Sequence, residues 1–376
     1  MRAVVFTDPA LASEAGRFVW LEVDTERPAS AAILKKYPLR ALPTYFIVEP
    51  DSEQIAIRWV GGATVPALRK ILDDGNTRVR AAWTDPSLLA GGMTDGKGSS
   101  GGKSTGSGAD PMAGVLDEFM NRADHLYAAE QDSAAAVAYL TAIEMAPDDW
   151  TSYGRAVESA LFSLSNTGES DKSLALAESA WPRLGHTPSA ATVASSGLDA
   201  AASLPDSIPG KADKVAMFEK AARSVLTDPT IPATADDRSG VYITMIGARD
   251  AMHDSVGSAA LTREWANFLD KEANAAKSPD ARTALDSHRL SAYLELKEPE
   301  KAVPFLLQSQ QDFPEDYNPP ARLAAAYKAM GDLPKALEAN SQALALVYGP
   351  RSLRVMDVRS DIQLAMGDAS AARATL

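Results

Sequence analysis

The sequence predicts two architectures in one chain, an incomplete α/β domain followed by an all-α solenoid of stacked helical hairpins. Three observations support this prediction. Short apolar runs alternate with helix-spaced segments over residues 16–72. A segment rich in glycine and serine follows at residues 92–111. Beyond it, alanines and tyrosines recur at a constant spacing around a Gly-Asp turn, which indicates an internal repeat.

Composition limits the chemistry that the chain can perform. Among its 376 residues there is no cysteine, which excludes disulfides, thiolate nucleophiles and cysteine-based zinc sites. The histidines lie too far apart along the chain to form a local pair of metal ligands: His125, His186, His253 and His288. Paired acids such as Asp148-Asp149 lie at expected helix boundaries, where acids cap helices. We therefore predict no catalytic residue, no metal site and no cofactor.

The net charge of −13 is unevenly distributed. Residues 1–90 hold 11 basic and 11 acidic side chains, so the whole excess of acid lies in residues 91–376. An acidic surface repels phosphate backbones, which argues against a nucleic-acid partner. No run approaches the roughly 18 apolar residues of a membrane span. We expect a soluble protein, cytoplasmic or periplasmic, with no membrane span.

Residues 1–83 show the pattern of alternating strands and helices. Three apolar runs are predicted as strands: Arg17–Val23, Thr44–Val48 and Ile55–Val60. Helical spacing predicts one helix over Ala29–Tyr37 and a second over Thr64–Leu72. The two glycines at positions 61 and 62 end the third strand.

Two short motifs lie between these strands, Y-P-L-R at residues 37–40 and L-P-T at residues 42–44. In this setting they resemble the second half of a thioredoxin domain. The resemblance implies a cis peptide bond before Pro43, which only an X-Pro bond adopts at low cost. It also implies that the backbone at Leu42 and Pro43 pairs with an extended substrate segment.

The family carries a strand and a Cys-x-x-Cys motif upstream of this point, and the chain has neither. Thiol–disulfide exchange needs a thiolate and a second, resolving thiol, so we predict no redox activity for this chain. Three explanations remain open. Met1 could be an internal methionine of a longer protein, the domain could have decayed, or Ala3–Phe6 could replace the missing strand. In the first case the reactive cysteines would lie upstream of Met1.

A flexible linker is predicted at residues 84–112. Gly or Ser fills 11 of the 20 positions from Gly92 to Pro111, a composition that cannot bury a core. The G-G-K-S-T run at residues 101–105 is no phosphate-binding loop, because Lys97 stands where the first glycine belongs. No apolar strand leads into this run either.

A repeat begins at residue 113 and is clearest near the C-terminus. Three pairs of positions are each 34 residues apart: Tyr293 and Tyr327, Ala302 and Ala336, and Pro314 and Tyr348. The tetrapeptide A-M-G-D at residues 329–332 returns at residues 365–368. This pattern resembles tetratricopeptide (TPR) repeats, and we predict a TPR-like α-solenoid over residues 113–376. Because the chain stops in the middle of a second helix, we expect the array to continue in a longer, bacterial parent protein.

The repeat assigns packing roles to particular residues. Small residues let two helix backbones approach, aromatic residues fill the gaps between them, and glycine supplies the turn. The signature positions are Ala123, Tyr139, Ala142, Tyr293, Ala302, Ala324, Tyr327, Gly331, Ala336, Ala343 and Gly367. Between the clear repeats, helices with a weak repeat signature, here called the worn helices, are predicted at Arg155–Leu164, Asp171–Trp181, Ala190–Ala202, Lys211–Leu226, Val241–His253 and Leu261–Ala275.

The TPR resemblance implies a protein or peptide partner in the groove of the array. Some arrays hold a partner's C-terminal carboxylate with Lys and Asn at offsets 5 and 9 of the first helix. Here those offsets carry Met120 and Asp124, Ser287 and Ser291, and Ala321 and Ala325, so that clamp is absent. We predict a non-enzymatic interaction scaffold. The alternative is a thiol–disulfide oxidoreductase or isomerase in the full-length protein, with the array recruiting substrates.

Overall fold

The computed structural model describes residues 9–376 except 15, 40–43, 61–64 and 85–110. The chain divides into two compact units. One consists of residues 1–21 and 37–176, and the other of residues 22–36 and 177–376. The predicted division at residues 83 and 112 stays a prediction.

The N-terminal segment contains short elements and a single small sheet among its described residues. In chain order these elements are η1 (Pro9–Glu14), η2 (Pro28–Ser30), α1 (Ala31–Lys36), β1 (Thr44–Val48), β2 (Ile55–Val60) and α2 (Val65–Thr84). β1 and β2 are antiparallel, with Thr44 opposite Val60 and Val48 opposite Ile55. Both strands are confirmed at their predicted bounds. The described residues show a two-stranded sheet, and they do not show a thioredoxin-like domain.

The strand predicted over Arg17–Val23 does not form. Only Phe18 makes a bridge, and Val19 and Leu21 expose 88% and 80% of their surface. A strand needs a partner for its backbone groups, and the sheet in the described part of the chain consists of β1 and β2 alone. The helix predicted over Thr64–Leu72 is also longer than predicted. It reaches Thr84 because Leu68, Leu72 and Val79 continue one buried face at helical spacing.

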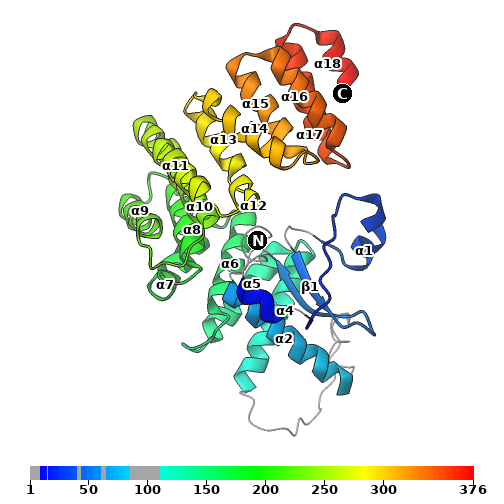
Figure 1. Cartoon of the computed structure of the whole chain (residues 1–376). Helices are drawn as coiled ribbons and strands as arrows, with labels where there is room; N and C mark the ends of the chain where they lie inside the picture. The colour runs from blue at the N-terminus through cyan, green and yellow to red at the C-terminus, as the bar shows by residue number, and fades with distance from the viewer. Residues whose placement is uncertain (1–8, 15, 40–43, 61–64, 85–110) are drawn as a thin grey trace. The chain divides into compact units, whose positions relative to one another are not determined.

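Helices fold back on one another throughout the rest of the chain (Figure 1). They are α4 (Pro111–Ala128), α5 (Asp132–Met145), α6 (Tyr153–Asn166), α7 (Ser170–Leu184), α8 (Ala190–Ser203), α9 (Lys211–Thr227), α10 (Ala235–Ala251), α11 (Ser255–Ala275), α12 (Pro279–Thr283), α13 (Asp286–Glu295), α14 (Val303–Asp312), α15 (Asn318–Met330), α16 (Leu333–Leu346), α17 (Arg351–Ala365) and α18 (Ala369–Thr375), with the short η4 (Pro299–Lys301) before α14. The six worn helices are therefore confirmed.

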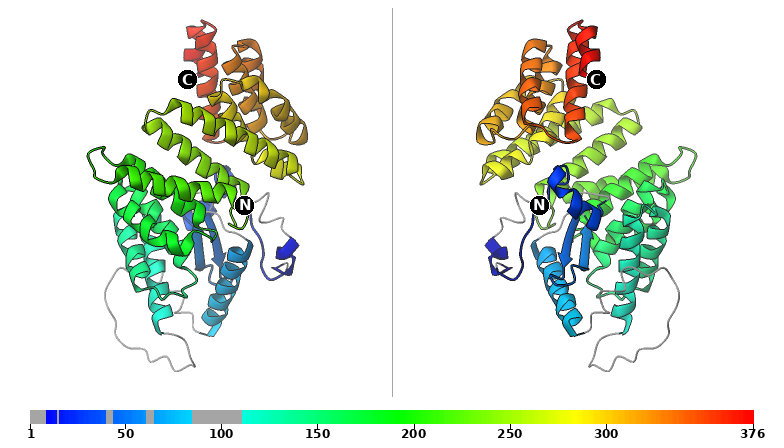
Figure 2. Two further views of the ribbon diagram at one scale, coloured as in Figure 1. Left: turned by 90° about the vertical axis from the view of Figure 1, so that its left-hand side faces the viewer. Right: turned by 90° about the vertical axis from the view of Figure 1, so that its right-hand side faces the viewer.

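Near the C-terminus, successive helices of the array pack on one another. α15 contacts α16, α16 contacts α17, and α17 contacts α18, so that α17 and α18 lie side by side (Figure 2). This stacking of antiparallel helix pairs is a TPR-like solenoid, as the repeat predicted.

Three of these hairpins share one kind of turn, in which a residue with positive φ is followed by an aspartate that caps the second helix. Gly331 and Gly367 have φ angles of +79° and +84°, a region that a Cβ disfavours. The following aspartate then caps the second helix, as Asp368 does by accepting from the Ala371 N–H at 2.9 Å. The α10–α11 hairpin uses the same turn through A-M-H-D at residues 251–254, with His253 at φ +58°. That third copy escaped the sequence comparison because histidine stands where the other turns have glycine.

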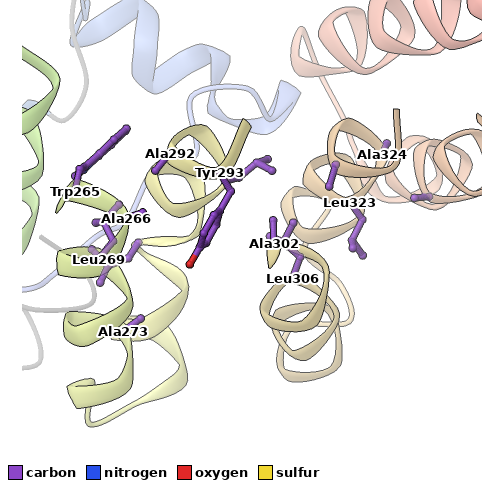
Figure 3. Packing of buried hydrophobic residues seen from close by; sticks show 14 of the residues in the cluster. Trp265, Ala266, Leu269, Ala273, Ala292, Tyr293, Ala302, Leu306, Leu323 and Ala324 are labelled. Carbon is purple, nitrogen blue, oxygen red and sulfur yellow. The ribbon is translucent and has the colours of Figure 1, made fainter. Parts of the chain in front are cut away.

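A continuous apolar core runs along the second unit from α10 to α17 (Figure 3). Leu269 and Ala273 on α11 and Tyr293 on α13 belong to it, as do Leu306 on α14 and Leu323 on α15. The N-terminal segment has a much smaller cluster, Leu11, Leu68 and Leu72.

Candidate functional site

The predicted signature residues form the framework of the array. Completely buried members of the set are Ala123, Ala142, Ala302, Ala324, Ala336 and Ala343. Tyr139 and Tyr293 are buried, Tyr327 is half-buried, and the two glycines form the turns described above. These side chains contact other helices, so they position a binding surface without being part of it. Leu42 and Pro43 lie outside the described residues, and their predicted substrate contacts stay a prediction.

In the first unit, one predicted groove position is already engaged. The Tyr139 hydroxyl donates to Asp124 Oδ1 at 2.6 Å, and Arg155 pairs with Asp124 Oδ2. Burial, together with the neighbouring Asp124 carboxylate, raises the pKa of Tyr139 above its usual range. The Arg155 guanidinium also lies 5.0 Å from the centroid of the Trp59 ring. Asp124 therefore ties α4, α5 and α6 together and is not available to a ligand.

In the second unit, offsets 5 and 9 of two successive first helices carry only small, uncharged side chains. These are Ser287 and Ser291 on α13 and Ala321 and Ala325 on α15, here called the small-residue face. Ser291 is exposed and the other three are partly exposed. Such residues allow a partner's backbone to come close, but they cannot pair with a carboxylate or transfer protons.

Acidic residues flank this face on the next first helix. The same offsets on α17 are Asp357 and Asp361, both exposed, and Lys328 of α15 pairs with Asp361 at 2.6 Å. On the other side, α10 presents Ile243, which is exposed. The corresponding offsets therefore carry small, neutral side chains on α13 and α15 and carboxylates on α17.

A partly buried polar network connects helices of the array around the small-residue face. Arg289 donates to Asp270 Oδ1 from Nε at 2.9 Å and from Nη2 at 2.8 Å. Tyr293 donates to the other oxygen of Asp270, and the Ser309 hydroxyl donates to Asp286 Oδ2 at 2.6 Å. Burial raises the pKa of the completely buried Asp286 and raises that of Tyr293 to about 12.

These two carboxylates do not form a catalytic pair. Asp270 is bound by Arg289 and Tyr293, and Asp286 has no exposed surface through which a substrate could reach it. The network instead links α11, α13 and α14, and Arg289 also stacks 3.7 Å from the centroid of the Phe305 ring. The sequence pattern did not reveal this network, because its members come from three different helices.

A serine, a histidine and an aspartate also meet between α10 and α13. Ser239 Oγ lies 2.8 Å from His288 Nδ1, and Asp236 Oδ1 lies 3.8 Å from the same nitrogen. A catalytic triad places the serine and the acid on opposite ring nitrogens. Ser239 is also completely buried and accepts a hydrogen bond from Trp265 Nε1 at 2.7 Å. The arrangement links α10, α11 and α13.

In the part of the chain that the structure describes, no group of three or more His, Asp or Glu side chains could hold a metal ion. None of the helices described is both long and apolar enough to cross a bilayer.

Comparison with known proteins gives likenesses of fold only. No family model and no curated protein matches the chain. Among solved structures, it is similar to a TPR protein from Parabacteroides merdae, with 12% identity, TM-score 0.46, and coverage of 70% of this chain and 91% of that one. A TPR protein from Thermus thermophilus has 16% identity and TM-score 0.33, covering 67% of this chain and 98% of that one. The TPR2AB domain of yeast Sti1 in a pHSP90 complex has 15% identity and TM-score 0.24, covering 70% and 88%.

The chain's own stacked hairpins and its repeated turn identify the TPR-like solenoid.

Proposed function

We propose that this chain is a protein-interaction scaffold whose TPR-like array binds a protein or peptide partner. The observation that supports this proposal most directly is the small-residue face of Ser287, Ser291, Ala321 and Ala325, which is accessible and uncharged. The acids beneath it, Asp270 and Asp286, are already bound by side chains of the array, which leaves this face to contact rather than chemistry.

The face indicates what kind of partner it would accept. Small side chains favour close packing against a partner's backbone or a narrow apolar strip, and the serine hydroxyls can add hydrogen bonds. A partner that ends in a carboxylate is not favoured, because these four positions offer no cation. Nucleic acid is not favoured either, given the net charge of −13.

A peptide selection tests this function. A random peptide library would be selected on the whole chain, and the enriched peptides measured against Ala325→Glu and against Gln311→Glu, an exposed position on α14. We expect at least about tenfold weaker binding to the first variant and unchanged binding to the second, because only the first places a carboxylate on the face. Failure to enrich any peptide, or equal binding to both variants, would contradict the proposal. Circular dichroism of both variants checks that they fold.

The N-terminal segment belongs to the proposal as a thioredoxin-like module over residues 1–83, followed by a linker over residues 84–112. Its support is the order of β1, β2 and α2, with antiparallel strands and Leu68 and Leu72 of α2 packed against Ile47 of β1. In such a module Leu42 and Pro43 would form a peptide-binding edge.

No redox turnover is expected from this chain, because it has no cysteine. Insulin reduction with dithiothreitol measures this directly, and turnover above the blank would contradict it. A longer protein with reactive cysteines upstream of Met1 could still be a thiol–disulfide oxidoreductase.

A further inference from the structure

A segment from the N-terminal part of the chain lies on the turn between α16 and α17. Both belong to the second unit, although Asp24 and Tyr348 are 324 positions apart in the sequence. The Tyr348 hydroxyl donates to Asp24, and Arg351 Nε lies 2.8 Å from Glu26 Oε1. Two carboxylates of the segment are therefore held by two side chains of one turn.

The backbone of the turn comes unusually close to the segment. Gly349 has φ +65°, and a Cβ added there would lie 3.0 Å from the Cβ of Glu26 and 3.1 Å from its carbonyl oxygen. A side chain at this position would require the segment to shift by a few tenths of an ångström. The Arg27 guanidinium lies 5.2 Å from the centroid of the Tyr348 ring, which adds a cation–π contact.

Contacts within the segment also fix its own conformation. The Glu26 N–H donates to Asp24 Oδ1 at 3.0 Å, and Arg27 Nε lies 3.7 Å from Asp24 Oδ2. This local turn presents the carboxylates of Asp24 and Glu26 together. The side chain of Glu26 is only 19% exposed, and its Oε2 is buried without a hydrogen-bond partner. Without Arg351, a buried carboxylate would lose its cation, which is costly.

We propose that the α16–α17 turn is a binding site for a short acidic segment of the pattern Asp-x-Glu-Arg, occupied here by the chain's own residues 24–27. The recognition elements are the Tyr348 hydroxyl and ring, the Gly349 backbone and the Arg351 guanidinium. The site is separate from the small-residue face, so the proposal holds whether or not that face binds a partner.

Disulfide trapping tests whether residues 24–27 occupy the site. The chain has no cysteine, so the pair Glu26→Cys and Gly349→Cys can form only one intramolecular bond. We expect rapid oxidation to a species that migrates faster on a non-reducing gel. The matched control combines Glu26→Cys with Gly367→Cys, because Gly367 has a similar φ of +84° and nothing within 4 Å of an added Cβ. Equal cross-linking rates in the two pairs would overturn the proposal.

A peptide measurement tests the recognition chemistry independently. A fluorescein-labelled peptide of residues 22–30 would be titrated with the Asp24→Ala/Glu26→Ala chain, in which the internal segment is weakened. We expect binding to this chain and about tenfold weaker apparent affinity for the unaltered chain, which corresponds to a site roughly 90% occupied internally. Adding Arg351→Glu to the double variant should abolish binding. Absence of binding to the double variant, or binding that survives Arg351→Glu, would overturn the proposal.

Discussion

In the N-terminal segment Val19 and Leu21 expose 88% and 80% of their surface, whereas Leu306 and Leu323 in the array expose 0% and 1%. All four residues are apolar and belong to segments that the sequence predicts to be buried. The difference lies in what covers them. The helices from α10 to α17 share one apolar core, whereas Val19 and Leu21 remain exposed in the part of the chain that the structure describes.

The comparison shows that burial in a repeat depends on its neighbours in sequence, and burial in a sheet depends on distant ones. A hairpin finds its cover one repeat further along the chain. A strand needs a partner that can come from any part of the chain. Among the described residues, the core that runs from α10 to α17 contains seventeen buried residues, and the cluster around Leu68 and Leu72 contains three.

The largest effect is expected from truncation of the array core. Leu323→Ala should lower the free energy of unfolding by about 2–5 kcal/mol, because it leaves a cavity between helices. Val19→Ala should change it by no more than about 0.5 kcal/mol, because this side chain is already exposed. Urea titrations followed by circular dichroism measure both. Similar losses in the two variants would show that residues 17–23 are buried after all.

The second prediction compares close packing in the two regions. A Cβ at Gly197 would lie 2.2 Å from Phe218 Cε1, in the middle of a buried ring, so Gly197→Ala should cost about 1–3 kcal/mol. A Cβ at Gly75 would lie 2.3 Å from Ile47 Cδ1, 3.0 Å from its Cγ2 and 3.2 Å from its Cβ, but Ile47 is only half-buried and has room to shift. Gly75→Ala should therefore cost less than Gly197→Ala.

Gly240→Ala is the helix control for both substitutions. Nothing lies within 4 Å of an added Cβ there, so this variant should gain about 0.5–1 kcal/mol from helix propensity. Thermal unfolding ranks the three variants. A cost at Gly75 equal to that at Gly197 would mean that the N-terminal segment is packed as rigidly as the array.

The third prediction concerns the repeated turn, which the array has and the N-terminal segment lacks. Gly331→Ala should cost about 1 kcal/mol, because φ at this position is +79°. His253→Gly should have the opposite sign and a smaller size, because His253 already holds φ +58° in the same turn. Guanidinium titrations measure both changes. Stabilisation by Gly331→Ala would contradict the description of a shared turn.

The smallest effect is expected from two carboxylates, one in each region, whose pKa values are lowered to about 2. Arg263 and Lys301 hold that of Glu298, whereas the side chain and N–H of Ser52, with Trp83, hold that of Glu49. A folded pKa below the unfolded value stabilises the protein above about pH 4.5 and loses that effect as pH falls toward 2. The difference in Tm between the unaltered chain and Glu298→Gln should therefore shrink from pH 6 to pH 3, and likewise for Glu49→Gln.

Salt should separate the two carboxylates. Added NaCl screens an ion pair such as that of Glu298, but it has little effect on the neutral donors around Glu49. Glu295→Gln, at an exposed position of α13, is the control for the loss of one carboxylate charge. Equal salt dependence of the Glu49 and Glu298 variants would refute this distinction.

Local patterns predicted most of the helices and both strands. Thr44–Val48 and Ile55–Val60 formed at their predicted bounds. The helices predicted in the middle region also formed, although α10 and α11 each begin six residues earlier than predicted. The pattern was wrong at Arg17–Val23, because an apolar run does not specify whether a strand lies beside it. It also missed the third turn, because His253 adopts there the positive φ angle that glycine adopts at Gly331.

The binding surfaces were predicted less well than the fold. Offsets 5 and 9 located Ser287, Ser291, Ala321 and Ala325, and the absence of a lysine clamp was visible in the sequence. The pairing of Asp124 with Tyr139 and Arg155, and the network around Asp270, join different helices and were not predicted. The contact of residues 24–27 with the α16–α17 turn joins opposite ends of the sequence, and no local pattern indicates it.

The amino-acid order alone determined the absence of thiol chemistry, the excess of acid and the stacked hairpins, since each of these depends on composition or on neighbours about one repeat away. Tertiary structure decided which apolar runs are buried, which acidic side chains pair with other side chains, and which turn contacts residues 24–27. These outcomes depend on contacts between distant residues, whose free energies exist only once the helices have been placed against one another.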